Sequence, residues 1–170
     1  MSRSQLPGAN GQVKAALATV LRRAPALVGV VSLLWRLRMP RFTAGVVGVI
    51  VDDAGRILLL EHVFHVQEPW GLPGGWLNRR ESPELALARE LREEIGLDIT
   101  VTRHLMTLVS PNRSHLDFAY LGQPCGEVRH LSAEILDYTW ADPSALPPLH
   151  PVHQRAVDAA FAVWVDEGQL

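Results

Sequence analysis

The chain has 170 residues, 48% of them hydrophobic and 20% charged, a composition that suits one folded domain with an appended element and excludes a disordered or collagen-like protein. Its net charge of −2 conceals an asymmetry, because residues 1–51 hold seven basic side chains and no acidic one. The remainder holds 9 bases against 18 acids, so the two regions should have different roles.

Residues 1–41 are predicted to form a basic, amphipathic helical extension. Apolar residues between positions 13 and 21 follow a helical period, and a second helix should run from Pro25 to about Arg38, which Pro40 ends. These helices could pack on the main domain, form a homodimer contact, or lie on an anionic membrane surface. No recognition motif accompanies the basic residues, so no specific nucleic-acid partner is predicted.

The apolar run at residues 24–35 is too short to cross a bilayer, which needs about 20 residues, and no signal-peptide cleavage pattern follows it. We therefore expect an unprocessed chain without a transmembrane helix. Cys125 is the only cysteine of the sequence, which fits a reducing compartment, and we expect a cytoplasmic protein.

Strands are predicted from position 44 onward. The apolar runs 44–51 and 57–60 flank a D-A-G-R turn and indicate a β-hairpin, central in a covered sheet because both strands are apolar on both faces. Residues 63–76 combine glycines, prolines and aromatics and indicate a loop. Further strands are expected within 98–110, 114–122 and 135–140, with residues 125–134 as a connection. A last helix should begin near His150 or Pro151, with the following residues on its inner face: Val152, Ala156, Ala159, Ala160 and Val163.

The acidic segment after residue 80 is predicted to be a helix from Pro83 to Ile95. Ser82 is a suitable N-cap, proline is favoured at the first helical position, and Gly96 is a natural stop. At 3.6 residues per turn the pattern indicates an apolar stripe of Leu85, Ala88, Leu91 and Ile95, with three acids on the opposite face: Glu90, Glu93 and Glu94.

The spacing of these acids favours a metal site. Glu90 lies three and four residues before Glu93 and Glu94, so like charges meet on the helix surface at a cost of a few tenths of a kcal/mol per pair. A solvated helix face is the plainer explanation, but such a face usually intersperses lysines and this one has none. A divalent cation would convert the repulsion into ligation. The preceding glycine-rich loop "GLPGGW" could bring a backbone carbonyl to the same ion.

The segment from Gly75 to Leu97 resembles the Nudix box at each of its nine defining positions: Gly75, Glu81, Arg89, Glu90, Leu91, Glu93, Glu94, Gly96 and Leu97. The resemblance implies a Nudix hydrolase domain over residues 42–170, an α/β protein with the Nudix fold, an α/β/α sandwich with a mixed β-sheet, preceded by the N-terminal helices. It implies metal-dependent hydrolysis of nucleoside diphosphate derivatives with Mg²⁺ or Mn²⁺. Homodimers are common among such relatives.

The resemblance also assigns roles by position. Glu90 and Glu94 would be primary metal ligands, Glu93 a further ligand or the general base, and the carbonyl of Gly74 would complete the shell. Glu134 lies where many relatives carry a catalytic glutamate on a later loop, so the base could be either Glu93 or Glu134. Four other box residues would brace or orient the glutamates: Arg89, Glu81, Gly75 and Gly96.

The substrate is less defined by the sequence. Candidate contacts to a nucleotide are Arg113, His115, Trp70 and Tyr120, with Trp76 as a second aromatic that could stack on a base. Pro111 is close to the position of a proline common in ADP-ribose-hydrolysing relatives, so ADP-ribose is the first expectation. Sanitising hydrolysis of nucleoside triphosphates, or a catalytically silent nucleotide-binding module, are the alternatives.

Overall fold

The computed structural model describes residues 11, 14, 19, 25–64, 67–109 and 114–166. The chain divides into two compact units, residues 1–41 and residues 42–170. In the first unit, helix α2 (Pro25–Arg38) has the bounds predicted from its two flanking prolines. The predicted helix at positions 13–21 lies almost entirely outside the described residues. Among the described helices, none combines the length and the apolar character needed to span a membrane.

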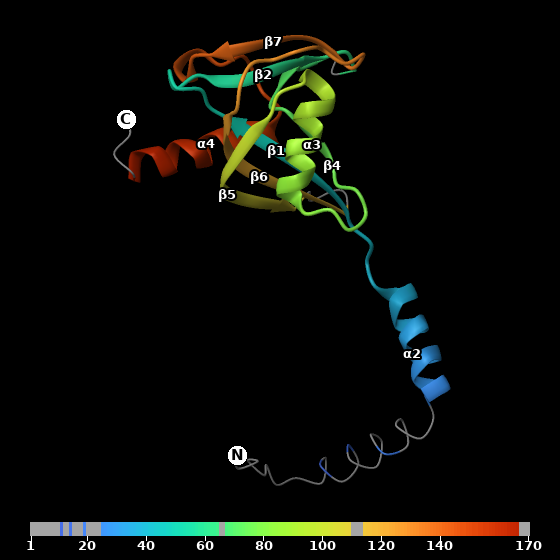
Figure 1. Cartoon of the computed structure of the whole chain (residues 1–170). Coiled ribbons are helices and arrows are strands. Elements are labelled where there is room, and N and C mark those ends of the chain that lie inside the picture. Colours follow the sequence, from blue (N-terminus) through green and yellow to red (C-terminus); the bar gives the residue numbers. More distant parts are fainter. Residues whose placement is uncertain are drawn as a thin grey trace. The chain divides into compact units, whose positions relative to one another are not determined.

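The second unit contains two sheets and two long helices (Figure 1). A four-stranded sheet has the order β4-β1-β6-β5, and a three-stranded sheet has the order β3-β2-β7. The elements are β1 (Thr43–Ile50), β2 (Ile57–His62), β3 (Trp70–Gly71), β4 (Gly74–Trp76), α3 (Pro83–Ile95), β5 (Ile99–Val109), β6 (His115–Pro124), β7 (Ile135–Ala141), the short 3₁₀ helix η1 (Pro143–Ala145) and α4 (Pro151–Asp166).

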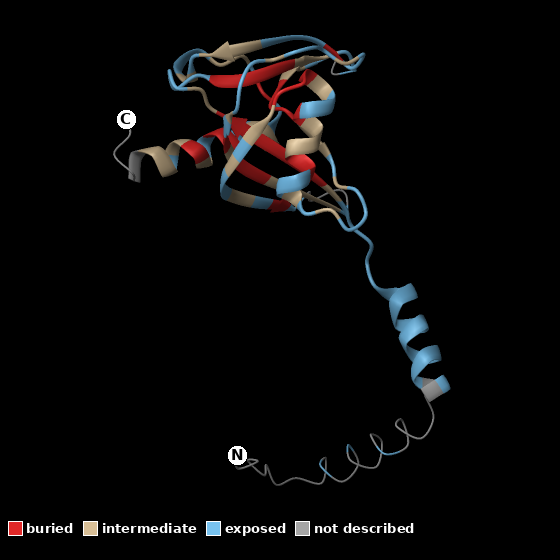
Figure 2. Ribbon diagram, in the orientation of Figure 1, coloured by how far each residue is buried: buried red, intermediate tan, exposed pale blue. Residues whose placement is uncertain are grey.

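The larger sheet is mixed, because β1 pairs in parallel with β6 and antiparallel with β4. Helix α3 packs on one face of this sheet and α4 on the other, so the α/β/α sandwich is confirmed. The α3 face buries Val46 and Ile50 with Leu87 and Leu91, whereas the α4 face buries alternate residues of the same strand: Val47 and Val49, with Ala156, Val157 and Ala160. Figure 2 shows this buried interior concentrated along the central strands.

The prediction of a hairpin from residues 44–51 and 57–60 was wrong. Strands β1 and β2 share one isolated antiparallel bridge between Val51 and Ile57, and then diverge into different sheets. The expectation that both strands are central in a covered sheet was right, since each strand lies between two partner strands and is almost completely buried. The predicted loop of residues 63–76 also contains the short strands β3 and β4.

Helix α3 begins and ends where its caps predict. The Oγ of Ser82 accepts a hydrogen bond from the Leu85 N–H at 3.4 Å, and Gly96 adopts a left-handed φ of 66° at the other end. A β-carbon at this φ would be strained, so glycine suits the position. The Gly96 N–H then donates to the Arg92 carbonyl at 3.1 Å, which closes the last turn.

The predicted apolar stripe of α3 was partly wrong. Leu91 and Ile95 are buried as predicted, but Leu85 is 65% exposed, while Leu87 is buried in its place. The buried side is therefore rotated toward the acids, and Glu94, next to Leu87 around the helix, is turned inward rather than toward solvent. Of the three acids only Glu93 is exposed.

Candidate active site

The site is built where the edge strand β4 faces α3. Register pairs Gly75 with Val46, which places position 75 on the α3 side of the sheet. A β-carbon at Gly75 would lie 2.8 Å from Glu90 Oε2 and closer still to Oε1 and Cδ. At Gly74 a β-carbon would overlap with the backbone of Val46. Both glycines are therefore required for close approach, since the strand leaves space for the Glu90 carboxylate only because it carries no side chain there.

Glu94 is the most perturbed carboxyl of the site. Burial raises its pKa to about 8, and the charge of Glu90 adds to this, whereas a hydrogen bond from the Gly74 backbone opposes it. The charges of Glu134 and Glu93 raise the pKa further. Its Oε2 atom is buried and has no hydrogen-bond partner among the residues that the structure describes. An acceptor held out of water without a partner is costly, so the position calls for a cation or a proton.

The segment before β7 is tied to the last turn of α3. Backbone N–H groups of Arg129, His130 and Ser132 donate to the carbonyls of Ile95 and Glu94 at 2.7–3.4 Å. The guanidinium of Arg129 also binds the Gly96 carbonyl and, at 2.9 Å, the carboxylate of Asp98. These bonds satisfy carbonyls that a helix end leaves free. They also hold Glu134, two residues beyond Ser132, close enough to α3 for its charge to act on Glu94.

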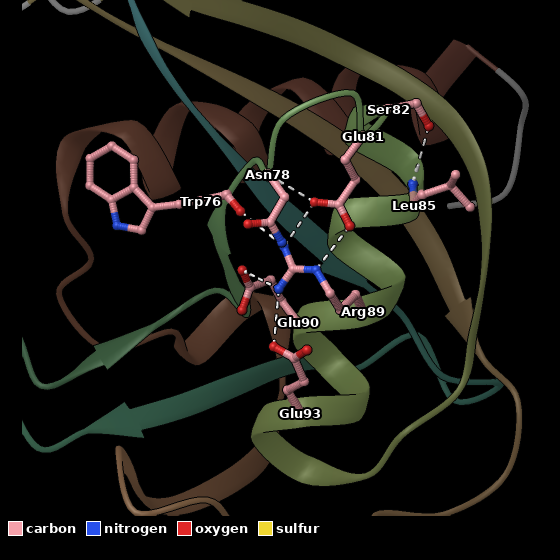
Figure 3. A network of polar contacts seen from close by, with 8 residues as sticks. All are labelled: Trp76, Asn78, Glu81, Ser82, Leu85, Arg89, Glu90 and Glu93. Atoms are coloured by element: carbon pink, nitrogen blue, oxygen red, sulfur yellow. Dashed lines mark hydrogen bonds and ion pairs between the residues drawn. The ribbon is translucent and has the colours of Figure 1, made fainter.

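Arg89 connects the acids of the box (Figure 3). Its guanidinium donates to both carboxylate oxygens of Glu81, at 2.9 and 3.0 Å, and to the Trp76 carbonyl at 3.0 Å. Its Nη1 lies 2.9 Å from Glu90 Oε1 and 3.0 Å from Glu93 Oε2. Hydrogen bonds from Arg89 and from the Asn78 N–H lower the Glu81 pKa to about 2. Glu81 thus fixes the orientation of Arg89, which in turn restrains Glu90 and Glu93.

These residues fit a divalent cation, although no group of three or more His, Cys, Asp or Glu side chains in the described ranges is already gathered to hold one. The ion pairs of Arg89 with Glu90 and Glu93 help to explain why the carboxylates are not gathered around one point, because each of these two acids is drawn toward the guanidinium. The fit rests on the buried, unpartnered oxygen of Glu94 and on the raised pKa of Glu90, which follows mainly from burial. Hard oxygen donors of this kind suit Mg²⁺ or Mn²⁺.

The predicted nucleotide contacts do not form one cluster. His115 lies on the α4 side of the sheet, opposite Glu90, where its Nδ1 is 2.7 Å from Thr43 Oγ1 and its Nε2 is 2.9 Å from Asp117 Oδ1. Its ring contacts Trp76 edge-on at a centroid distance of 4.9 Å, and Trp76 is 62% exposed. A ligand that touches both this pair and Glu90 must therefore cross the edge strand β4.

Two further candidates have structural roles. Tyr120 is 5% exposed in the core and donates its hydroxyl to Glu84 at 2.8 Å, so the prediction that it contacts a nucleotide is not supported. Burial raises its pKa to about 12, with a further contribution from that hydrogen bond. Trp70 is half-buried and packs against the α4-side core. Arg113 and Pro111 lie outside the described residues.

Sequence reasoning missed Arg129, Ser132 and Asp98. Their importance comes from contacts between segments more than thirty residues apart, as in the bond from Arg129 to the Gly96 carbonyl. A stop glycine at position 96 predicts free carbonyls at the end of α3. It does not predict which later segment supplies the donors.

Comparisons with known proteins agree with this geometry. A family model described as NUDIX domain matches residues 40–161. A MutT-like protein from Streptomyces ambofaciens is 31% identical over 104 residues, which cover 61% of this chain and 66% of that protein. The NAD-capped RNA hydrolase NudC from Mycobacterium bovis is 31% identical over 103 residues, covering 59% of this chain and 33% of NudC. The chain thus spans less than two thirds of the length of these two relatives.

A solved structure shares the fold and matches a larger part of this chain than the two sequence relatives do. The crystal structure of a MutT NUDIX hydrolase from Burkholderia pseudomallei superposes with a TM-score of 0.59 at 28% identity, covering 71% of this chain and 98% of that one.

Proposed function

The chain belongs to the Nudix family, and from that premise we propose that it is a divalent-metal-dependent hydrolase of phosphoanhydride bonds in nucleoside diphosphate derivatives. The observation that carries the proposal is Glu94, a buried carboxylate with one unpartnered oxygen beside Glu90. A cation bound at this position would offset the cost of burying the Glu94 carboxylate, because a buried charge without a partner destabilises the protein.

Glu90, Glu94 and the Gly74 carbonyl would hold the cation, with Glu93 as a further ligand. When bound, Mg²⁺ or Mn²⁺ would neutralise charge on the phosphate oxygens and lower the barrier to attack. Glu94 must lose its proton to bind a cation, and its pKa of about 8 makes this loss measurable near neutral pH. Arg89 would hold the Glu90 carboxylate against β4, where Gly75 leaves space for it.

Glu134 is our candidate for the general base, which takes the proton from the attacking water. Its charge acts on Glu94, so it lies near the site, whereas the alternative, Glu93, already accepts a hydrogen bond from Arg89 at 3.0 Å. A hydrogen bond to a guanidinium occupies an oxygen that a general base needs free to meet water. Glu134→Gln should lower kcat by roughly 100-fold or more with little change in KM. Glu127→Gln, in the same connecting segment, is the matched control. Full activity of Glu134→Gln would return the base role to Glu93.

The substrate class is proposed with ADP-ribose as the first compound to test. Nucleoside triphosphates are the second candidate, in line with an 8-oxo-dGTP diphosphatase from Proteus vulgaris that is 44% identical over 55 residues. A phosphate-release assay should compare ADP-ribose, nucleoside triphosphates, sugar nucleotides and dinucleotides with Mg²⁺ and with Mn²⁺. Glu94→Gln serves as the inactive control, since it cannot supply the carboxylate. If folded protein hydrolyses no compound with either cation, the chain is a nucleotide-binding module instead of an enzyme.

We place this activity in the cytoplasm, in line with the single cysteine of the sequence. A homodimer is a further part of the proposal, and sedimentation velocity of the purified protein tests it.

A further inference from the structure

Helix α2 has a broad apolar side and a narrow polar side. Gly29, Ser32 and Arg36 are three and four residues apart, so they share one side of the helix. The other described positions from 28 to 37 are all apolar, and their side chains are between 41% and 66% exposed: Val28, Val30, Val31, Leu33, Leu34, Trp35 and Leu37. No described residue of the first unit covers them. A soluble helix with this much apolar surface requires a partner.

The charges of this unit indicate the nature of the partner. Arg36, Arg38 and Arg41 lie at the end of α2 and just beyond it, and residues 1–51 contain seven bases and no acid. With 14 residues, α2 is too short to cross a bilayer, which needs about 20. A short helix that joins a wide apolar side to cationic residues can lie in the plane of a membrane, with its apolar side among the acyl chains.

We propose that α2 binds the surface of an anionic membrane. The arginines would meet the lipid phosphates, while Leu34, Trp35 and Leu37 enter the boundary between headgroups and acyl chains. Nucleic acid would satisfy the positive charge but would leave the apolar side uncovered. Packing of α2 on a protein surface would cover part of its apolar side, but it would not explain why residues 1–51 contain seven bases and no acid. The inference is independent of the enzymatic proposal, because membrane binding is measured without any substrate.

The test is sedimentation of the full chain with vesicles. We expect the protein to sediment with vesicles of phosphatidylglycerol and phosphatidylcholine at low salt, to be partly released at high salt, and to bind pure phosphatidylcholine weakly. The triple variant Arg36→Gln, Arg38→Gln, Arg41→Gln should lower the partition coefficient on the order of 100-fold, at about fivefold per lost charge.

A second variant tests the apolar side. Leu34→Ser with Leu37→Ser should lower the partition coefficient more than tenfold, whereas Ser32→Asn, on the polar side, should leave it unchanged. Circular dichroism of each full-chain variant verifies that its helix content matches that of the unmodified protein. Absence of sedimentation with anionic vesicles at low salt would overturn the proposal. So would equal binding of the arginine variant and the unmodified protein. If the leucine variant instead converts a dimer to a monomer and the protein binds no vesicles, α2 is a subunit contact.

Discussion

The space at Gly75 gives the sharpest prediction about the site. A β-carbon at this position would lie 2.8 Å from Glu90 Oε2, and closer to two other atoms of that carboxylate, where ordinary contacts begin near 3.4 Å. Gly75→Ala must therefore displace the Glu90 carboxylate by about 1 Å, because the strand behind position 75 is fixed by pairing with β1. Misplacement on this scale costs roughly 100-fold in rate when the group is catalytic.

The same substitution should destabilise the fold by only about 1 kcal/mol, at the low end of the cost of overpacking, because the atoms that must move are the far end of the flexible Glu90 side chain. The assays are kcat with the preferred nucleotide, Mn²⁺ affinity by calorimetry, and urea unfolding of the metal-free protein. A double-mutant cycle isolates the cause: in the Glu90→Ala background, where the carboxylate is absent, Gly75→Ala should cost less than about 0.5 kcal/mol. Wild-type kcat and Mn²⁺ affinity in Gly75→Ala, or an equal stability cost in both backgrounds, would contradict this prediction.

Three further predictions concern the network around α3. Arg89→Ala should lower the free energy of unfolding, measured by urea titration, by about 1–2 kcal/mol. Arg89→Lys should not recover this stability, because an ammonium cannot reproduce the planar contacts to Glu81 and the Trp76 carbonyl. The folded-state pKa of Glu94, raised from 4.5 to about 8, means that the unfolded chain loses this proton first, so the metal-free protein should lose stability as pH rises from about 4.5 to 8. Glu94→Gln should remove that slope in unfolding measured with a chelator present, and an unchanged slope would contradict the assignment. Arg129→Ala should reduce kcat several-fold with KM nearly constant, because Arg129 helps to hold the segment that carries Glu134. In the Glu134→Gln background the same substitution should have no further effect on kcat. Additive losses of kcat in the double variant would show that Arg129 does not act by positioning Glu134.

Local signals predicted the helix α3 well. Its bounds follow from Ser82, Pro83 and Gly96, each of which acts on the backbone within a few residues of itself. The box residues were found for a similar reason, because glycine spacing and acid spacing are local in sequence. Figure 3 shows that three of the box acids, Glu81, Glu90 and Glu93, converge on Arg89.

Nonlocal packing explains what the sequence did not predict. Leu85 is an exception, because Leu87, Leu91 and Ile95 are spaced four residues apart, and this local spacing already favours Leu87 over Leu85 for the core. The sheet to which β2 belongs depends on β7, which lies more than seventy residues later in the chain. Tyr120 looked available to a ligand, but its hydroxyl is bound to Glu84 across the α3 face. The pairing of β2 and the contact of Tyr120 each depend on a distant partner that no local pattern identifies.

The bonds between residues 129–132 and the end of α3 have a consequence for protein engineering. They join the helix α3 and the segment that carries Glu134 into one structural unit. Residues 129–132 supply the hydrogen-bond donors, and the carbonyls at the end of α3 are the acceptors. A change in loop length between Ser132 and β7 would shift Glu134 without moving the helix, and so would alter the distance between their carboxylates in steps of one residue. Conversely, the two pieces should be transplanted into another scaffold together, because either piece alone would carry unpaired backbone groups into its new host.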